Sequence, residues 1–188
     1  DLIDTTPFAV TGGVSITAKG HITVNVKSIT ESITVRSTTG NIALNDLTTA
    51  GETSLTASGT IHAGITSNAS GTVAAGSEVH LVSLKSSTAT LTLSAAAVAL
   101  DALETNTHTL TINTAASVAL PALTHTASDV VAPAAATFVA EKLASASGTI
   151  DVKTGAAITV ANLATTTETL VDFANMLTLT LKEQSNSI

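Results

Sequence analysis

The chain has 188 residues and a formal net charge of −7, and charged residues make up only 11% of it. Apolar residues make up 44%, aromatic residues 2%, and cysteine is absent. The absence of cysteine excludes a disulfide framework and thiolate metal sites. The high apolar content argues against disorder, and the lack of a basic cluster argues against nucleic-acid binding.

Residues 1–13 precede the first regular unit, and we expect them to form a lead-in or a cap. From residue 14 apolar residues alternate with polar ones, the period of a strand with one buried face. The pairs that open each unit are Val14/Ile16, Ile33/Val35, Thr53/Leu55, Val73/Ala75 and Leu91/Leu93. The pairs that form the second strand of each unit are Ile22/Val24, Ile42/Leu44, Ile61/Ala63 and Val79/Leu81.

From Leu91 onward the repeat becomes regular, with an interval of 20 residues. The positions in phase are Val98–Val118–Phe138–Ile158, Leu100–Leu120–Ala140–Val160, Leu103–Leu123–Leu143–Leu163 and Leu110–Val130–Ile150–Leu170. Each unit reads as strand, short turn, strand, inward leucine and polar bend. The last unit is irregular, because Asp172 occupies an apolar position and Leu177/Leu179 come early. Residues 182–188 form a polar tail.

This pattern predicts an all-β, single-chain β-solenoid, similar to a parallel β-helix, over residues 14–181. We count about nine coils of 18–20 residues. Stacked coils lie about 4.8 Å apart, which gives a rod on the order of 40 Å long with a continuous narrow core. The longest apolar stretch, Val130 to Ala140, is too short to span a bilayer, so we expect no membrane insertion.

The outward positions of both strands carry small, nearly uncharged residues. On the second strand they are Thr23, Ala43, His62, His80, Ala99, Ala119, Val139, Thr159 and Thr178. On the first strand they are Ser15, Thr34, Ser54, Ala74, Thr92, Thr111, Val131, Asp151 and Val171. Alanine and valine on an outer surface favour packing against a copy or a partner. The alternative is that a short sheet simply tolerates small residues there.

No catalytic, cofactor or metal site follows from the sequence. His62 and His80 share a register in adjacent coils, but only Glu78 is close to them in sequence, so we interpret them as solvated or interface residues rather than as a metal site. His108 and His125 lie in the polar bends, and nothing links them to a serine and an aspartate. Asp129 and Asp151 lie about one coil apart, and two carboxylates alone are a weak cation site.

We therefore expect that the protein is not an enzyme. The sequence has no phosphate-binding glycine loop, no HExxH and no GxSxG motif. A β-helical enzyme that acts on polysaccharides is the least favoured alternative, because the chain has no Trp or Tyr to stack on sugars. Asn68-Ala-Ser70 is a formal glycosylation sequon.

Threonine rows raise ice binding as an alternative function. Thr90 and Thr92 stack over Thr109 and Thr111, but Asp129/Val131 and Thr149/Asp151 then break the row. A second row in the polar bends, with Thr124, Thr126 and Thr165 to Thr167, is interrupted by Ala144 and Ser145.

The units Ala-Leu-Pro121-Ala-Leu-Thr124 and Val160-Ala-Asn-Leu-Ala-Thr165 resemble the Leu- and Thr-rich β-solenoid repeats of microbial surface proteins and virion fibres. The Leu-Pro-Ala-Leu-Thr step is also similar to receptor L-domain repeats, although the asparagine ladder and cysteine cap of leucine-rich repeats are absent. The resemblance implies an extracellular, cell-surface or virion-surface setting. We expect a structural or adhesive module that associates with itself, end to end or laterally, into a filament or surface assembly. A surface glycan and ice are the other partners considered.

Overall fold

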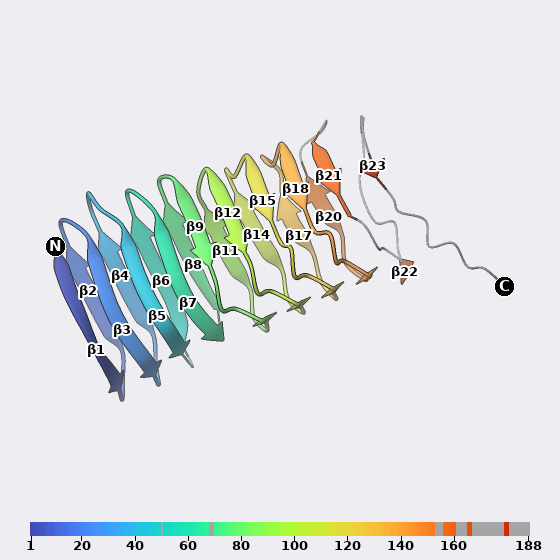
Figure 1. Ribbon diagram of the computed structural model, residues 1–188. Coiled ribbons are helices and arrows are strands. Elements are labelled where there is room, and N and C mark those ends of the chain that lie inside the picture. The colour runs from blue at the N-terminus through green and yellow to red at the C-terminus, as the bar shows by residue number, and fades with distance from the viewer. Residues whose placement is uncertain (50, 68–69, 153–155, 161–164, 167–178, 181–188) are drawn as a thin grey trace.

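The computed structural model describes residues 1–49, 51–67, 70–152, 156–160, 165–166 and 179–180. Over these residues the chain winds through successive coils of parallel strands, so the predicted single-chain β-solenoid is confirmed (Figure 1). The coils follow one another along a single axis, with the N-terminus at one end (Figure 1). The described residues contain no helix that could cross a membrane.

In the described residues sheet A, the largest, has ten parallel strands, each hydrogen-bonded to the neighbouring strands of adjacent coils. Its strands in spatial order are β1 (Leu2–Val10), β3 (Ile22–Ile29), β5 (Ile42–Thr49), β7 (Ile61–Ser67), β9 (Glu78–Leu81), β12 (Ala97–Leu100), β15 (Ser117–Ala119), β18 (Thr137–Val139), β21 (Ala157–Thr159) and β23 (Leu179–Thr180).

Sheet B has eight parallel strands, which mark about seven full turns of the chain. They are β2 (Val14–Ala18), β4 (Ile33–Ser37), β6 (Glu52–Ala57), β8 (Ser70–Ala75), β11 (Leu91–Ser94), β14 (Leu110–Asn113), β17 (Val130–Ala132) and β20 (Ile150–Val152). Partners across adjacent strands are 18 residues apart at Thr53 and Gly71 and 20 apart at Val130 and Ile150, which confirms the coil length. The expected ninth coil, opened by Leu170, lies outside the described residues.

Sheet C occupies a third side of the coil, where a polar bend was predicted. Its five strands are β10 (Ser86–Ser87), β13 (Thr105–Asn106), β16 (His125–Thr126), β19 (Ser145–Ala146) and β22 (Thr165–Thr166). The two-strand unit was therefore incomplete, because a two-residue strand is too short to display alternation. A tight turn at the inward leucine leads to β13, β16 and β19, as where Leu123 N donates to Leu120 O at 3.1 Å.

The inward columns predicted from the repeat form one continuous core. Each of the following residues is 5% exposed or less: Val98, Val118, Phe138, Ile158, Leu100, Leu120, Ala140, Val160, Leu103, Leu123, Leu143, Leu110, Val130 and Ile150. The earlier pairs Ile33/Val35, Thr53/Leu55, Leu91/Leu93, Ile22/Val24, Ile42/Leu44, Ile61/Ala63 and Val79/Leu81 are also buried. Val14 and Ile16 are only partly buried, because they belong to the first coil.

The predicted pair Val73/Ala75 faces the core, since Val73 is buried and Ala75 packs against the core, but its predicted register in sheet B is wrong by two residues. In sheet B, Val73 lies opposite Leu55 and Leu93, and Gly71 lies opposite Thr53 and Leu91. The residues of β8 that correspond to the pairs of the neighbouring strands are therefore Gly71 and Val73. The alternation in the sequence is compatible with both registers of β8, because a shift of two residues leaves the same side chains facing the core. A Cβ on Gly71 would collide with the Thr53 carbonyl oxygen, so a residue without a side chain is needed where β8 approaches β6.

Residues 2–10, expected as a lead-in or cap, form β1, the edge strand of sheet A. Leu2 lies opposite Ile22 and Ile3 opposite Thr23, and the register then shifts between Asp4 and Phe8. Pro7 lies within this irregular segment, as is common on edge strands, because proline offers no N–H to a further strand.

Candidate interaction faces

The outward row of sheet A follows the prediction closely. Thr23, Ala43, His62, His80, Ala99, Ala119, Val139 and Thr159 lie in register, one on each successive strand. Thr178, the expected next member, lies outside the described residues, and this prediction is wrong by two residues, because Thr180 is the residue opposite Thr159. In the C-terminal half, the outward residues of four strands form what we call the small-residue face: Ala97, Ala99, Ser117, Ala119, Thr137, Val139, Ala157 and Thr159.

Two histidines of this row lie beside an aspartate in the middle of the molecule. The rings of His62 and His80 are 4.9 Å apart between centroids and nearly perpendicular, at 85°. His80 Nε2 lies 2.7 Å from Asp101 Oδ2. The expectation that the pair has no carboxylate partner is therefore wrong. Asp101 was missed because it lies in the next coil, directly beyond the end of β12.

The outward row of sheet B is more regular than predicted. With β8 shifted by two residues, Thr72 rather than Ala74 lies opposite Ser54 and Thr92. The row of hydroxyl residues is therefore unbroken over six strands. We call it the hydroxyl row: Ser15, Thr34, Ser54, Thr72, Thr92 and Thr111. It ends where Val131 and then Asp151 follow in the same register, as expected.

The threonine row proposed for the polar bends is not an outward row in the described residues. Thr126 is fully buried, and its Oγ1 donates to Ser128 O at 2.6 Å. Thr124 is exposed, but its hydroxyl donates to Glu104 O at 2.9 Å. The side chains of Thr165 and Thr166 and the whole of Thr167 lie outside the described part of the structure.

The remaining polar candidates have local structural partners. Asp129 Oδ1 accepts a hydrogen bond from Thr149 N at 2.8 Å. Asp151 instead points outward from β20, so the two carboxylates have different surroundings. His125 Nδ1 lies 2.6 Å from Ser145 Oγ in the next coil. This serine contact was not predicted, and among the described residues no aspartate or glutamate is hydrogen-bonded to His125 to complete a triad.

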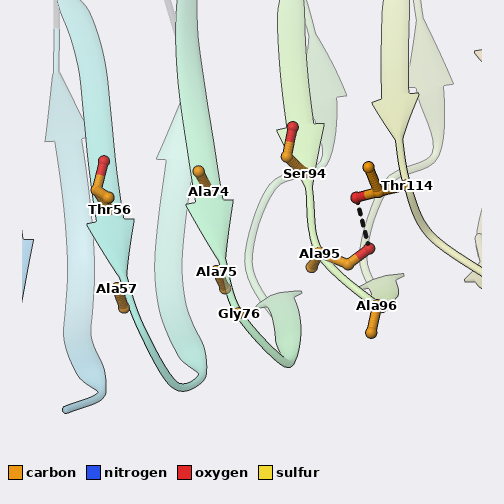
Figure 2. A pocket seen from close by; sticks show the side chains of 9 residues that line it. All are labelled: Thr56, Ala57, Ala74, Ala75, Gly76, Ser94, Ala95, Ala96 and Thr114. Atoms are coloured by element: carbon orange, nitrogen blue, oxygen red, sulfur yellow. Dashed lines mark hydrogen bonds between the residues drawn. The ribbon is translucent and has the colours of Figure 1, made fainter. Parts of the chain in front are cut away.

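A shallow groove of about 470 Å³ follows the corner between sheets B and A (Figure 2). Four residues separate Leu93 from Val98, whereas five separate Val73 from Val79 and Ile112 from Val118. This shorter turn leaves the corner hollow. The lining residues are Thr56, Ala57, Ala74, Ala75, Gly76, Ser94, Ala95, Ala96 and Thr114.

At the rim of this groove, Thr114 adopts a left-handed backbone conformation with a φ of 65°, which is unusual for a β-branched residue. Its Oγ1 donates to Ala95 O at 3.2 Å and links two adjacent turns (Figure 2). The groove therefore has a defined shape, but its lining contains no charged side chain.

The described residues contain no group of three or more His, Cys, Asp or Glu side chains placed to hold a metal ion. Asn68 of the sequon lies outside the described residues. No protein-family model matches the chain, and neither a curated protein nor a solved structure matches it.

Proposed function

We propose that this protein is an extracellular structural or adhesive β-solenoid module that associates laterally with copies of itself into a filament or surface assembly. The observation that carries the proposal is the small-residue face, which has no charged residue over four successive strands. Alanine, serine, threonine and valine lose little side-chain freedom on burial. A flat row of such residues packs well against another sheet about 10 Å away. The extracellular setting is supported by the repeat-style resemblance.

The size of the face indicates how such an assembly would be held together. The four strands of the face at about 4.8 Å each, with a strip about 12 Å wide, offer roughly 230 Å² per copy. Two copies would bury about 460 Å² in total, which is below the 1,200–2,000 Å² of a standard interface. A single pair is therefore weak, and stable association depends on many contacts repeated along an array.

Charge opposes the same association. Each copy carries a formal net charge of −7, so copies repel one another at low ionic strength. Salt screens this repulsion, because the Debye length falls from about 30 Å at 0.01 M to about 8 Å at 0.15 M. Assembly is therefore expected to increase with protein concentration and with salt.

The test uses a matched pair of variants, Ala119→Glu at the centre of the small-residue face and Val131→Glu on the outward side of sheet B. Both substitutions add one negative charge at an outward position, so they alter the net charge equally. Sedimentation velocity and electron microscopy would be run on both variants and the unaltered protein at 0.15 M salt. We expect the unaltered protein and Val131→Glu to assemble and Ala119→Glu to stay monomeric.

Circular dichroism would first establish that both variants retain the β-sheet spectrum. A monodisperse monomer for the unaltered protein at high concentration and high salt would reject the proposal. Equal assembly of all three proteins would also reject it, because the contact would then lie on another surface.

Ice binding is the second candidate, and the unbroken hydroxyl row favours it. Six Ser or Thr residues in register on a rigid sheet repeat at about 4.8 Å, the spacing of adjacent strands. Their hydroxyls can hydrogen-bond ordered water at the same interval. The row thus offers a regular series of hydroxyls, which is longer than the sequence pattern predicted because Thr72 replaces Ala74 in it.

Thermal hysteresis and ice-recrystallisation assays test this second candidate. Thr72→Lys in the hydroxyl row should abolish any activity, because a long charged side chain interrupts the regular surface. Thr159→Lys, which adds the same charge to the outward row of sheet A, is the control and should leave it unchanged. Absence of hysteresis in the unaltered protein would eliminate ice binding.

A further inference from the structure

The His62 and His80 pair has a geometry that neither proposed function requires. The two residues lie directly opposite each other on β7 and β9, so their rings project from the same face of sheet A. Their neighbours in the same row, Ala43 and Ala99, carry no side chain beyond Cβ and leave the rings accessible. His62 is exposed, and the His80 side chain is 29% exposed.

The separation of the rings matches that of two imidazoles bound to one ion. Zinc lies about 2.0–2.1 Å from a histidine nitrogen, and its coordination is tetrahedral. Two imidazoles bound in that way have centroids about 5 Å apart. The observed separation is 4.9 Å, and the rings make an edge-to-face contact with an angle of 85° between their planes. Binding of an ion between the two imidazoles requires the rings to rotate but does not require the strands to move.

Asp101 determines which nitrogen of His80 is free to bind. An ionised carboxylate only accepts hydrogen bonds, so His80 Nε2 donates its proton to Asp101 Oδ2 at 2.7 Å. The lone pair of the neutral ring is then on Nδ1. A carboxylate that orients a histidine through its second nitrogen is the usual outer partner of metal-binding histidines. Asp101 therefore acts on the ion through His80 rather than as a ligand.

We propose that His62 and His80 bind one divalent transition-metal ion of the class that prefers imidazole, represented by Zn²⁺. The protein supplies two nitrogen ligands, and water occupies the other positions. Such a site has fewer than three protein ligands, which agrees with the absence of a larger metal-binding group in the described residues. The inference does not depend on lateral assembly or on ice binding.

Isothermal titration of the full chain with Zn²⁺ at pH 7.5 tests the proposal. The variants are His62→Ala and His80→Ala, and alanine is the residue found in this row on the adjacent strands, so both should fold. We expect one ion per chain in the unaltered protein and no binding in either variant. Asp101→Ala should weaken binding about tenfold, as expected for the loss of an outer-sphere partner.

His108→Ala is the matched control, because His108 is also an exposed histidine but lies away from sheet A. It should bind Zn²⁺ as the unaltered protein does. The proposal is overturned if the unaltered protein binds no zinc, or if zinc binding survives in both His62→Ala and His80→Ala while those variants retain the β-sheet spectrum.

Discussion

Buried polar residues in sheet C influence the stability of the third side of the solenoid. Ser87, Asn106 and Thr126 are fully buried on successive strands of sheet C. Asn106 Nδ2 donates to Thr126 Oγ1 at 3.1 Å, and Thr126 in turn donates to Ser128 O. Within the described residues, Asn106 Oδ1 has no hydrogen-bond partner. The asparagine is thus only half satisfied, whereas the threonine hydroxyl both accepts and donates.

Two substitutions should separate these roles. Thr126→Val leaves Asn106 Nδ2 without an acceptor in the interior and should lower the free energy of unfolding by about 1–3 kcal/mol. Asn106→Leu removes the unpaired oxygen, and Thr126 keeps its bond to Ser128, so this variant should be neutral or more stable. Ala146 in the same column indicates that an apolar residue fits there. Urea unfolding measures both, and a larger loss for Asn106→Leu than for Thr126→Val would contradict this account.

At the scale of elements, the turns between sheets B and A bring the backbones of adjacent coils close together. Gly40 lies in the turn between β4 and β5 and is buried. A Cβ at this position would lie 2.6 Å from Gly20 C and from His21 N, both backbone atoms of the preceding coil. Glycine is needed here for close approach, and the neighbouring backbone cannot move without disturbing the stacking of the strands.

Gly40→Ala should therefore lower stability by about 1–3 kcal/mol, the usual cost of overpacking. Gly13→Ala is the control, because its added Cβ would meet no atom closer than 3.5 Å, which is an ordinary contact. The control should change stability by less than about 0.5 kcal/mol. Thermal unfolding followed by circular dichroism compares the two, and equal midpoints would show that the turn has room to adjust.

At the scale of the whole molecule, each strand of the three sheets pairs only with strands of the coils before and after it. Stability is then approximately a sum over coils and their interfaces, as in other repeat proteins. Ser117 and Thr137 occupy equivalent positions in successive coils. After removal of one complete coil, the two coils that become neighbours should therefore form an interface equivalent to those in the intact protein.

Deletion of residues 117–136, one complete coil, should give a folded protein that is shorter by about 4.8 Å. Deletion of residues 117–126 is the control, because it removes half a coil and joins a turn to the wrong side of the solenoid. That variant should not fold. Circular dichroism tests folding, and small-angle X-ray scattering tests the length. Loss of folding in both variants would argue against independent coils.

The solenoid, its coil length and most of its core could be predicted from the amino-acid sequence. Alternation specifies which face of each strand is buried, and a repeat near 20 residues places Val118, Phe138 and Ile158 in one column. These are local features, because each coil must bury the same narrow strip of apolar side chains. The outward row of sheet A follows from the same frame, and so the register of His62 with His80 was predictable.

The features that depend on pairing between coils could not be predicted from the sequence. Alternation permits two frames for β8, and the backbone contact of Gly71 with Thr53 selects the one that places Thr72 in the hydroxyl row. Sheet C escaped detection because two-residue strands have no period. Asp101 reaches His80 diagonally from the next coil, a contact set by side-chain direction rather than by sequence spacing. Local patterns specify faces, whereas register and side-chain partners require the neighbouring coil to be in place.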